Sequence, residues 1–283
     1  MIQKQNVPLS QLTTFQNEGE MPVVCIFDDM KELSEYVDGN DNFFVLGKGS
    51  NIVINPDEEF PPIVQIASTY KQPTLKGTVL EAGAGVTVNQ LMNISKDDGI
   101  TGLEFMAGVP ASVGGMVAMN FGCWGTEVAD ILISAEIMKE DGSIHQMLGA
   151  DLQFSYRNSL LQHEPYIVLS AKFNVGKDDP NIVKQRIHSN IQTRLDSQPL
   201  RDKTFGSTFR NPSGLYAGKL LEDYGFKGYR LGPVMFSEKH ANFMVNLGGA
   251  TYDDVVRLMQ RVEAEIRGKR GLSLSAEVML VSL

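Results

Sequence analysis

Apolar and polar positions alternate at strand spacing up to about residue 70, with one helical segment among them. Apolar runs of strand length occur at 23–27, 43–47, 51–54 and 63–66. Residues 28–37, DDMKELSEYV, place apolar side chains at helical spacing and lie between the first two runs. Strands and a helix in this order predict a parallel or mixed sheet.

A second stretch of strands and helices extends to about residue 204. The predicted elements are a strand over 78–86, a helix over 87–98, a hairpin over 133–147, a strand over 167–175 and a helix over about 181–195. Asp141-Gly142 supplies the turn of the hairpin. Gln198-Pro199 ends the last helix, because the residue before a proline disfavours helical backbone, and it marks a domain boundary.

The rest of the chain predicts a smaller α+β unit over residues 206–270. Its elements are a helix over 215–224, a strand over 242–247 and a long helix over 253–267. Thr251 is the expected cap of the long helix and Gly271 its stop. Residues 272–283 read as a final strand that returns to an earlier sheet.

Composition and charge exclude several classes of protein. With 42% hydrophobic and 21% charged residues, the chain is neither disordered nor a coiled coil. The 25 basic and 34 acidic residues give a net charge of −9, which disfavours nucleic acid and anionic lipid but allows a small anionic ligand in a local cationic pocket. The uncharged segment 105–126 is too rich in turn residues for a membrane helix.

Cysteine and histidine usage gives no support for a metal site or a disulfide framework. The two cysteines are far apart, and the four histidines show no ligand spacing. The N-terminus has no apolar core of a secretory signal, so we expect a protein of the reducing cytoplasm.

Glycine, at 27 residues, is clustered in two places that suit ligand binding. Residues 47–51, GKGSN, lie between two apolar strands, where consecutive backbone N–H groups can surround a diphosphate. The alternative for this segment is an ordinary turn between strands. The glycine-rich run over 102–125 allows the backbone to approach a flat cofactor, although tight packing of loops would need the same residues.

Polar residues interrupt the apolar pattern at several further places. The segments are SYRNS (155–159), GSTFRNP (206–212), AGKLLEDYGFKGYRLG (217–232), SEKHANF (237–243) and Glu277 within a mostly apolar strand. A buried carboxylate without a partner costs several kcal/mol, so Glu277 is either functional or at an edge that faces water. The cations of the smallest unit suit a phosphorylated or carboxylate ligand, with surface solvation as the alternative.

Together and in this order, these segments resemble the UDP-N-acetylenolpyruvoylglucosamine reductase family over nearly the whole chain. GLEFMAGVPASVGG and the terminal SAEV match the family as well, and the direct step from GCWG to the hairpin is similar to its shorter form. The resemblance implies an α+β fold of the vanillyl-alcohol-oxidase type. Its expected parts are FAD-binding lobe 1 (1–70), FAD-binding lobe 2 (71–204, with returning strand 273–283) and a substrate-binding domain (205–272).

The resemblance also implies the chemistry and the residues that perform it. NADPH reduces FAD, which then reduces the enolpyruvyl group of UDP-N-acetylglucosamine enolpyruvate to give UDP-N-acetylmuramate for peptidoglycan. The implied catalytic residues are Ser207 as proton donor, with Arg157 and Glu277 acting on the substrate carboxylate. FAD would be bound by Gly47, Gly49, Ser50, Asn51, Gly108, Ser112, Gly114, Gly115 and Asn120. The substrate would be bound by Tyr156, Asn211, Lys219, Arg230 and Lys239.

Some positions depart from the family pattern, and a rival interpretation stays open. The segment TTFQNEGE (13–20), Ala111 and FGCWG (121–125) replace the usual residues, all on the expected FAD side. A divergent or non-catalytic FAD-binding relative that acts on or senses another sugar nucleotide is the alternative. We expect a monomer with small-molecule partners, without nucleic acid, membrane or metal.

Overall fold

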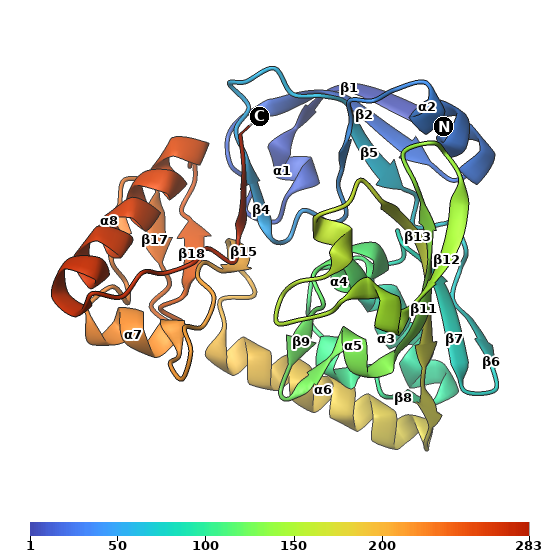
Figure 1. The fold of residues 1–283 in the computed structure, drawn as a ribbon. Helices are drawn as coiled ribbons and strands as arrows, with labels where there is room; N and C mark the ends of the chain where they lie inside the picture. Colours follow the sequence, from blue (N-terminus) through green and yellow to red (C-terminus); the bar gives the residue numbers. More distant parts are fainter. Residues whose placement is uncertain (283) are drawn as a thin grey trace. The chain divides into compact units, whose positions relative to one another are not determined.

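The computed structural model describes residues 1–282 (Figure 1). Backbone contacts divide the chain into two units. Unit 1 comprises Met1–Lys4, Val23–Lys48 and Pro61–Thr193. Unit 2 comprises Gln5–Pro22, Gly49–Phe60 and Arg194–Leu283. Each unit is therefore assembled from segments that are far apart in the sequence.

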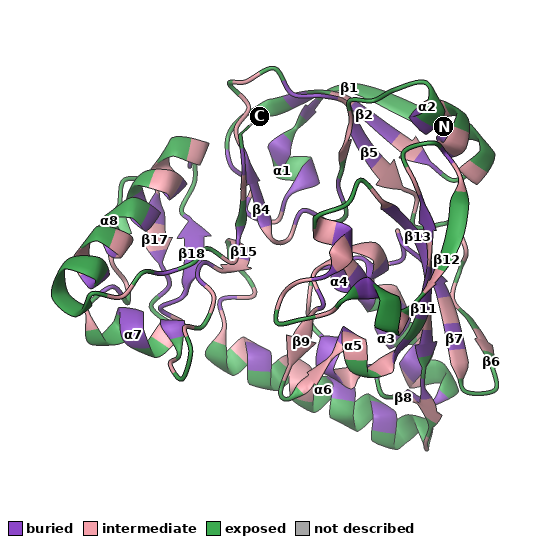
Figure 2. Cartoon of the chain, in the orientation of Figure 1, coloured by how far each residue is buried: buried purple, intermediate pink, exposed green. Residues whose placement is uncertain are grey.

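The larger sheet of unit 1 is antiparallel and has five strands. Its order is β12 (Ile144–Leu148), β11 (Leu132–Met138), β13 (Ile167–Asn174), β7 (Val79–Gly83) and β6 (Thr74–Lys76). The central strand β13 is buried along most of its length, whereas the edge strand β12 is mostly exposed (Figure 2). Helix α4 (Val113–Ala118) packs on β13 and β7, so the glycine-rich segment lies directly on this sheet.

A second sheet has the order β1 (Ile2–Pro8), β2 (Glu20–Phe27), β5 (Ile63–Ile66) and β3 (Phe44–Val45). β2 and β3 both run parallel to β5. Helix α2 (Met30–Asp38) buries Leu33 and Val37 in one cluster with Phe27 and Val64. Asp29 begins this helix, because its side chain accepts a hydrogen bond from the backbone of Lys31 at 2.7 Å.

Short elements complete unit 1 around helix α3 (Val88–Asp98). They are β8 (Ile100–Thr101), η1 (Glu104–Met106), β9 (Gly122–Cys123), β10 (Thr126–Glu127), α5 (Val128–Ile131), η2 (Gly149–Leu152), η3 (Leu160–Gln162) and β14 (Gly176–Lys177). Helix α6 (Pro180–Ser197) then carries the chain from unit 1 into unit 2.

Unit 2 has a four-stranded antiparallel sheet covered by two helices. The strand order is β15 (Lys203–Ser207), β18 (Phe243–Asn246), β17 (Val234–Phe236) and β16 (Arg230–Leu231). The helices are α7 (Ala217–Asp223) and α8 (Tyr252–Arg270), and both contribute to one buried core with β17 and β18. Thr251 caps α8 in a capping box with Asp254, and Gly271 ends the helix in the left-handed conformation.

Segments from the first sixty residues complete unit 2. They supply α1 (Leu9–Leu12) and β4 (Ile52–Ile54), and β4 pairs in parallel with β19 (Met279–Val281) near the C-terminus. Asn246 of β18 holds the segment after α1, since its side-chain amide donates to the carbonyls of Phe15 at 3.0 Å and Gln16 at 2.8 Å. Its amide oxygen accepts from the backbone of Gly248 at 2.8 Å and Ala250 at 3.3 Å.

Most predicted elements are observed with small shifts at their ends, and the C-terminus differs most. The final strand is confined to Met279–Val281, and it pairs with β4 rather than with the sheet expected for lobe 2. The boundary between the two contact units along α6 lies between Thr193 and Arg194. Pairing of the C-terminus with β4 is a long-range contact, which local patterns do not reveal.

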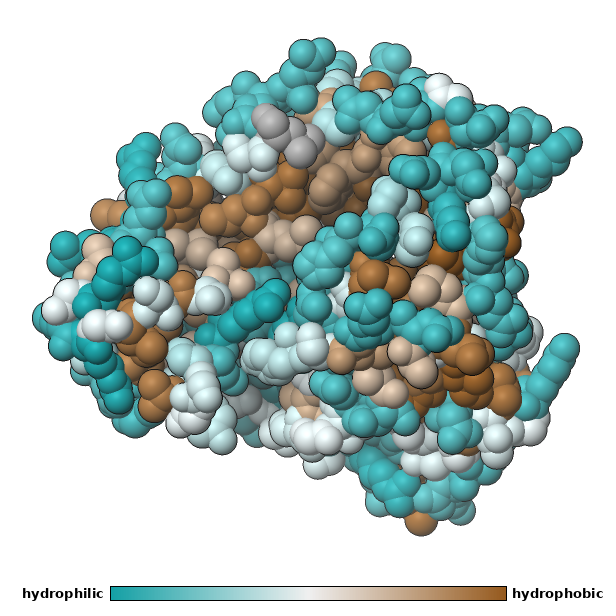
Figure 3. Space-filling view, in the orientation of Figure 1, coloured by the Kyte–Doolittle hydropathy of each residue, from teal (hydrophilic) through white to brown (hydrophobic). Residues whose placement is uncertain are grey.

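Hydrophilic residues alternate with apolar patches on the face shown in Figure 3. Within residues 1–282, none of the helices is long and apolar enough to cross a membrane. The same residues contain no cluster of histidine, cysteine or acidic side chains suited to a metal ion.

Replacing Asn246 by alanine should destabilise the protein, because four backbone groups lose their partner at one buried position. We expect the free energy of unfolding to fall by about 3 kcal/mol, measured by urea denaturation. Asn174→Ala is the matched control, since Asn174 lies at the exposed end of β13. Equal free energies of unfolding for the Asn246 variant and the control would contradict the role of Asn246 in holding the segment after α1.

Candidate active site

In unit 1, the first glycine of the GKGSN segment lies against the hydroxyl of Ser112. A Cβ atom on Gly47 would lie 2.6 Å from Ser112 Oγ, and one on Gly115 would lie 3.5 Å from it. The side chain of Gln65 donates to the carbonyl of Gly47 at 3.0 Å. Three of the residues expected to bind FAD are thus neighbours. Gly47 follows β3 of one sheet, whereas Ser112 begins α4, which packs on the other sheet.

Ser112 is a buried residue whose hydroxyl has no partner among the described residues. The residue is 3% exposed and begins helix α4, but its side chain does not cap that helix. Across residues 1–282, no other group forms a hydrogen bond with this hydroxyl. A hydroxyl that no described residue uses, next to Gly47, is available to a polar ligand.

The backbone of residues 47–51 offers a set of unused donors. None of its N–H groups donates a hydrogen bond to any residue in the described part of the chain. Gly49 has φ of +59°, and a Cβ atom there would lie 2.2 Å from the carbonyl oxygen of Leu12, so only glycine fits. Consecutive N–H groups without partners suit the oxygens of a diphosphate, and the residues present therefore fit that part of FAD.

The other predicted FAD residues have structural contacts of their own. Gly114 donates from its backbone to Ala84 at 2.9 Å, which brings α4 close to the chain after β7. Asn120 is fully buried, its amide donates to the carbonyl of Ser155 at 3.0 Å, and its oxygen accepts from the backbone of Ala129 at 3.0 Å. Asn51 donates to the carbonyl of Glu277 at 3.0 Å. Ser50 is half-buried, and Gly108 is exposed with φ of +82°.

Arg157 lies in a tight turn of unit 1. Ser155 and Asn158 exchange backbone hydrogen bonds of 3.0 Å on either side of it, and its own φ is +54°. Its Nη2 atom donates to the carbonyl of Gly122 at 2.8 Å. Tyr156, the other residue of the turn, is 47% exposed.

The segment that follows Ser207 pairs with the segment that contains Glu277 within unit 2. Ser207 ends β15, and the next residues, Thr208 and Phe209, run beside the C-terminal segment. Glu277 donates from its backbone to Thr208 at 2.9 Å, and Ala276 forms an isolated bridge with Phe209. Apart from its chain neighbours, no described atom lies within 4 Å of the Cβ position of Gly206, so the space beside this glycine is open.

Asn242 holds this segment from the other side, and sequence reasoning did not identify it. Its side chain accepts from the backbone of Phe209 at 3.0 Å and donates to the carbonyl of Phe209 at 2.8 Å. Its backbone N–H points to Nδ1 of His240 at 3.2 Å. Burial lowers the pKa of His240, so this imidazole is neutral and Nδ1 is an acceptor at neutral pH. The HAN part of SEKHANF therefore positions the strand that ends at the serine.

Four of the predicted substrate residues lie in unit 2, and only Lys239 lines its cavity. Asn211 Oδ1 accepts from the backbone of Ala217 at the start of α7 at 2.9 Å. Lys219 is exposed and pairs with Asp223 at 2.7 Å, a hydrogen bond that raises the pKa of the lysine. Arg230 is exposed and donates to the carbonyl of Gly232 at 2.7 Å.

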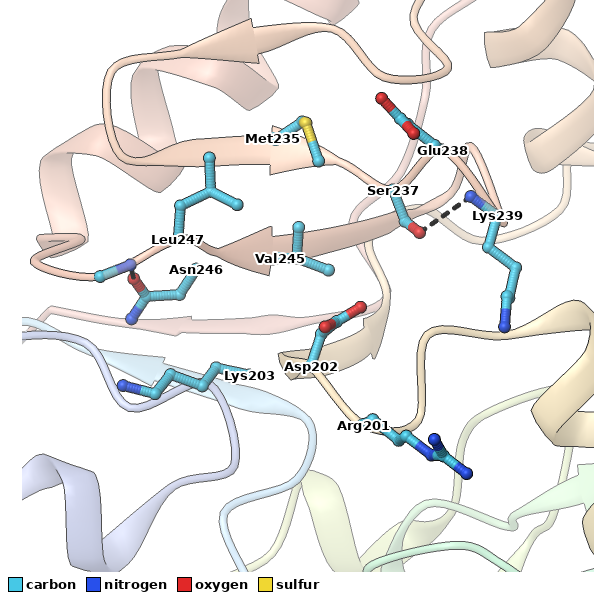
Figure 4. A pocket seen from close by; sticks show the side chains of 11 residues that line it. Arg201, Asp202, Lys203, Met235, Ser237, Glu238, Lys239, Val245, Asn246 and Leu247 are labelled. Carbon is cyan, nitrogen blue, oxygen red and sulfur yellow. Dashed lines mark hydrogen bonds between the residues drawn. The ribbon is translucent and has the colours of Figure 1, made fainter.

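The cavity of unit 2 has a volume of about 500 Å³ and lies beside β17 and β18 (Figure 4). Met235 and Val245, which are cross-strand partners, form its apolar side. The basic side chains at its edge are Arg201, Lys203 and Lys239, with Asp202 and Glu238 among them. This mixture suits a ligand with an apolar part and an anionic part.

Comparison with known proteins agrees with these features. A family model described as UDP-N-acetylenolpyruvoylglucosamine reductase, C-terminal domain, matches residues 198–281, and one described as FAD binding domain matches residues 28–148. Proteins named UDP-N-acetylenolpyruvoylglucosamine reductase from Bacillus subtilis and Caldanaerobacter subterraneus are 35% and 33% identical over 98% of this chain, and the matches cover 93% and 92% of those proteins.

A solved structure gives the same picture. The crystal structure of UDP-N-acetylenolpyruvylglucosamine reductase from Thermus caldophilus is 31% identical to this chain, with a TM-score of 0.87. The match covers 99% of this chain and 100% of that one. The expected α+β FAD-binding fold is thereby confirmed.

Ser112→Ala should lower the affinity for FAD without unfolding the protein, because it removes a hydroxyl that no described residue uses. One lost hydrogen bond to a charged group is worth roughly 1.5–3 kcal/mol, or about 10- to 100-fold in affinity. Flavin content and the dissociation constant for FAD measure this effect. Ser95→Ala is the matched control, since Ser95 Oγ is also buried without a partner but lies inside helix α3. Unchanged FAD affinity in the Ser112 variant would remove Ser112 from the FAD site.

Proposed function

The chain belongs to the UDP-N-acetylenolpyruvoylglucosamine reductase family, and from this premise we propose which of its residues perform the reaction. The protein is an FAD-dependent oxidoreductase that uses NADPH to reduce UDP-N-acetylglucosamine enolpyruvate to UDP-N-acetylmuramate in peptidoglycan synthesis. The observation that carries this conclusion is the match of 98% of the chain to reductases of nearly equal length.

The FAD site is proposed on the backbone donors of residues 47–51 and on the hydroxyl of Ser112. FAD held there would supply hydride transfer from NADPH to the enolpyruvyl double bond. Gly49 allows the loop backbone to pack closely against the carbonyl of Leu12. Gly114 holds the start of α4 against the chain after β7, because its N–H donates to the carbonyl of Ala84. Asn51 and Asn120 act by holding Glu277 and the arginine turn, because their side chains bond to backbone groups there.

The catalytic residues are proposed to act on the negative charge that addition of the hydride creates on the substrate. Addition of hydride to the terminal carbon of the enol ether places negative charge on the adjacent carbon and its carboxylate. A cation held in a water-poor site stabilises such charge strongly, and Arg157 supplies it, with Glu277 polarising the same carboxylate. Ser207 donates the proton to the carbon, and the serine proton departs as the charge on carbon grows.

Substrate recognition is proposed for Tyr156, Asn211, Lys219, Arg230 and Lys239. Lys239 has the strongest support, because it lines the cavity of unit 2 together with Arg201 and Lys203. We also propose that the protein acts as a monomer in the cytoplasm on small molecules. Its net charge of −9 supports the absence of nucleic-acid and anionic-membrane partners.

A single spectroscopic experiment tests the activity. The flavin absorbance of the purified protein should bleach with NADPH and return when UDP-N-acetylglucosamine enolpyruvate is added. A flavin that bleaches but is not reoxidised by this sugar nucleotide would indicate a divergent relative.

Arg157→Ala should slow reoxidation of the reduced flavin by about 10²- to 10³-fold, the effect of losing one donor to a developing anion. Bleaching by NADPH should stay near normal, because that step does not involve the substrate carboxylate. Stopped-flow absorbance separates the two half-reactions. Arg186→Ala is the matched control, since Arg186 lies in the same unit and pairs with Asp178 at 2.8 Å on the surface. Normal reoxidation together with a lower melting temperature would make Arg157 structural.

Ser207→Ala should also leave bleaching by NADPH near normal and slow reoxidation by about 10²- to 10⁴-fold, as expected for loss of a positioned acid. Ser207→Cys should retain part of the rate, because a thiol is more acidic than a hydroxyl. The neighbouring Thr208→Val is the control, since Thr208 Oγ1 is buried without a partner. An alanine variant that reoxidises as fast as the wild type would show that the proton comes from elsewhere.

A further inference from the structure

The guanidinium of Arg157 is held by two aromatic rings and one carbonyl within unit 1. Its Cζ atom lies 5.5 Å from the ring centroid of Phe121 and 5.3 Å from that of Tyr156. The carbonyl of Gly122, next to Phe121, accepts from Nη2 at 2.8 Å. Both ring distances are within the range of a cation–π interaction.

The backbone that carries the arginine is firmly attached to the segment that carries Phe121. Ser159 Oγ donates to the carbonyl of Ala118 at 2.6 Å, and Asn120 donates to the carbonyl of Ser155 at 3.0 Å. Gln162 donates to the carbonyls of both Ala118 and Arg157, at 2.9 and 3.2 Å. The turn of Arg157 therefore cannot move independently of the chain after α4.

The ring of Phe121 is held in place by its neighbours, whereas that of Tyr156 is exposed. Its backbone N–H donates to Met116 at 3.0 Å, and its carbonyl accepts from Val128 at 2.9 Å. Its ring stacks on that of Phe105, with centroids 6.3 Å apart and an interplanar angle of 14°, and it packs against the main core of unit 1. Tyr156 is 47% exposed at the tip of the turn.

Gly122 is fixed beside it by the short hairpin of β9 and β10. Gly122 pairs with Glu127, and a Cβ atom on Gly122 would lie 2.7 Å from Glu127 Cβ. The carbonyl that accepts a hydrogen bond from Arg157 thus belongs to a residue, Gly122, where a larger side chain would collide with Glu127.

We propose that Phe121 is a positioning residue that orients the Arg157 guanidinium for the substrate carboxylate. The proposal rests on the proposed function of Arg157. An arginine side chain has several rotatable bonds, and an aromatic ring at cation–π distance restricts them without accepting any of the N–H donors of the guanidinium. Phe121 contacts neither the carboxylate nor the reacting carbon in this role.

The kinetic test compares Phe121→Leu with Phe121→Tyr. Leucine keeps an apolar side chain of similar bulk but lacks a π face, so reoxidation by the enolpyruvyl substrate should slow by about 3- to 30-fold. Tyrosine keeps the π face and should restore most of the rate. Bleaching by NADPH should be unchanged in both variants, because it does not depend on Arg157.

A double-mutant cycle shows whether Phe121 acts through the arginine. In an Arg157→Ala background, Phe121→Leu should cause no further loss of reoxidation rate. Equal losses in the two backgrounds would mean that Phe121 does not act through Arg157, and the proposal would be abandoned. Phe154→Leu is the matched control, since Phe154 is also partly buried against the core of unit 1. It should leave both half-reactions unchanged.

A readout independent of activity is the Nε–Hε NMR signal of Arg157 in the holoenzyme labelled with ¹⁵N-arginine. Arg157→Lys identifies the signal, and ring currents should displace it from the free-arginine position in the wild type. Phe121→Leu should move it towards that position, whereas Phe154→Leu should not. An unmoved signal would overturn the proposal. A moved signal together with normal reoxidation in Arg157→Ala would instead refute the catalytic role of Arg157.

Discussion

The antiparallel bridge between Phe209 and Ala276 is the contact on which the site residues of unit 2 depend. It brings the backbone of Thr208 and Phe209, the two residues after Ser207, beside that of Ala276 and Glu277, although the two segments are far apart in the sequence. Asn51 belongs to the same junction. Its side chain donates to the carbonyl of Glu277, and its backbone carbonyl accepts a hydrogen bond from the N–H of Met279 in β19. One backbone junction thus joins the end of the glycine loop, the predicted acid and the predicted carboxylate.

Asparagine side chains fasten the irregular segments around this junction and around the arginine turn. Asn120, Asn242 and Asn246 are each buried and each use both the oxygen and the nitrogen of the side-chain amide on backbone groups. Segments outside regular ladders leave N–H and C=O groups without partners, and an amide can satisfy one of each. These amides therefore attach the loops that carry predicted site residues to the neighbouring backbone.

The two kinds of predicted functional group are supported differently. The features proposed to bind FAD are backbone N–H groups and a small hydroxyl, so they depend on the close approach of the backbone at Gly49 and on the position of Ser112 at the start of α4. The charged group Arg157 depends on contacts to its side chain, from Gly122 and from the rings of Phe121 and Tyr156. A long flexible cation needs such contacts, because its own backbone position does not determine where its charge lies.

The sequence by itself determined the order and kind of most elements and the family, and it predicts the segments that carry the chemistry. Hydrophobic periodicity and caps are local signals, so α8 with Thr251 and Gly271 could be predicted almost to the residue. Only the tertiary structure decided that β19 pairs with β4 and that Phe121 lies beside Arg157. It also decided which backbone segments Asn242 and Asn246 hold. Each of these is a contact between distant residues, whose partner is chosen by the packing of the whole chain and leaves no periodic trace in the local sequence.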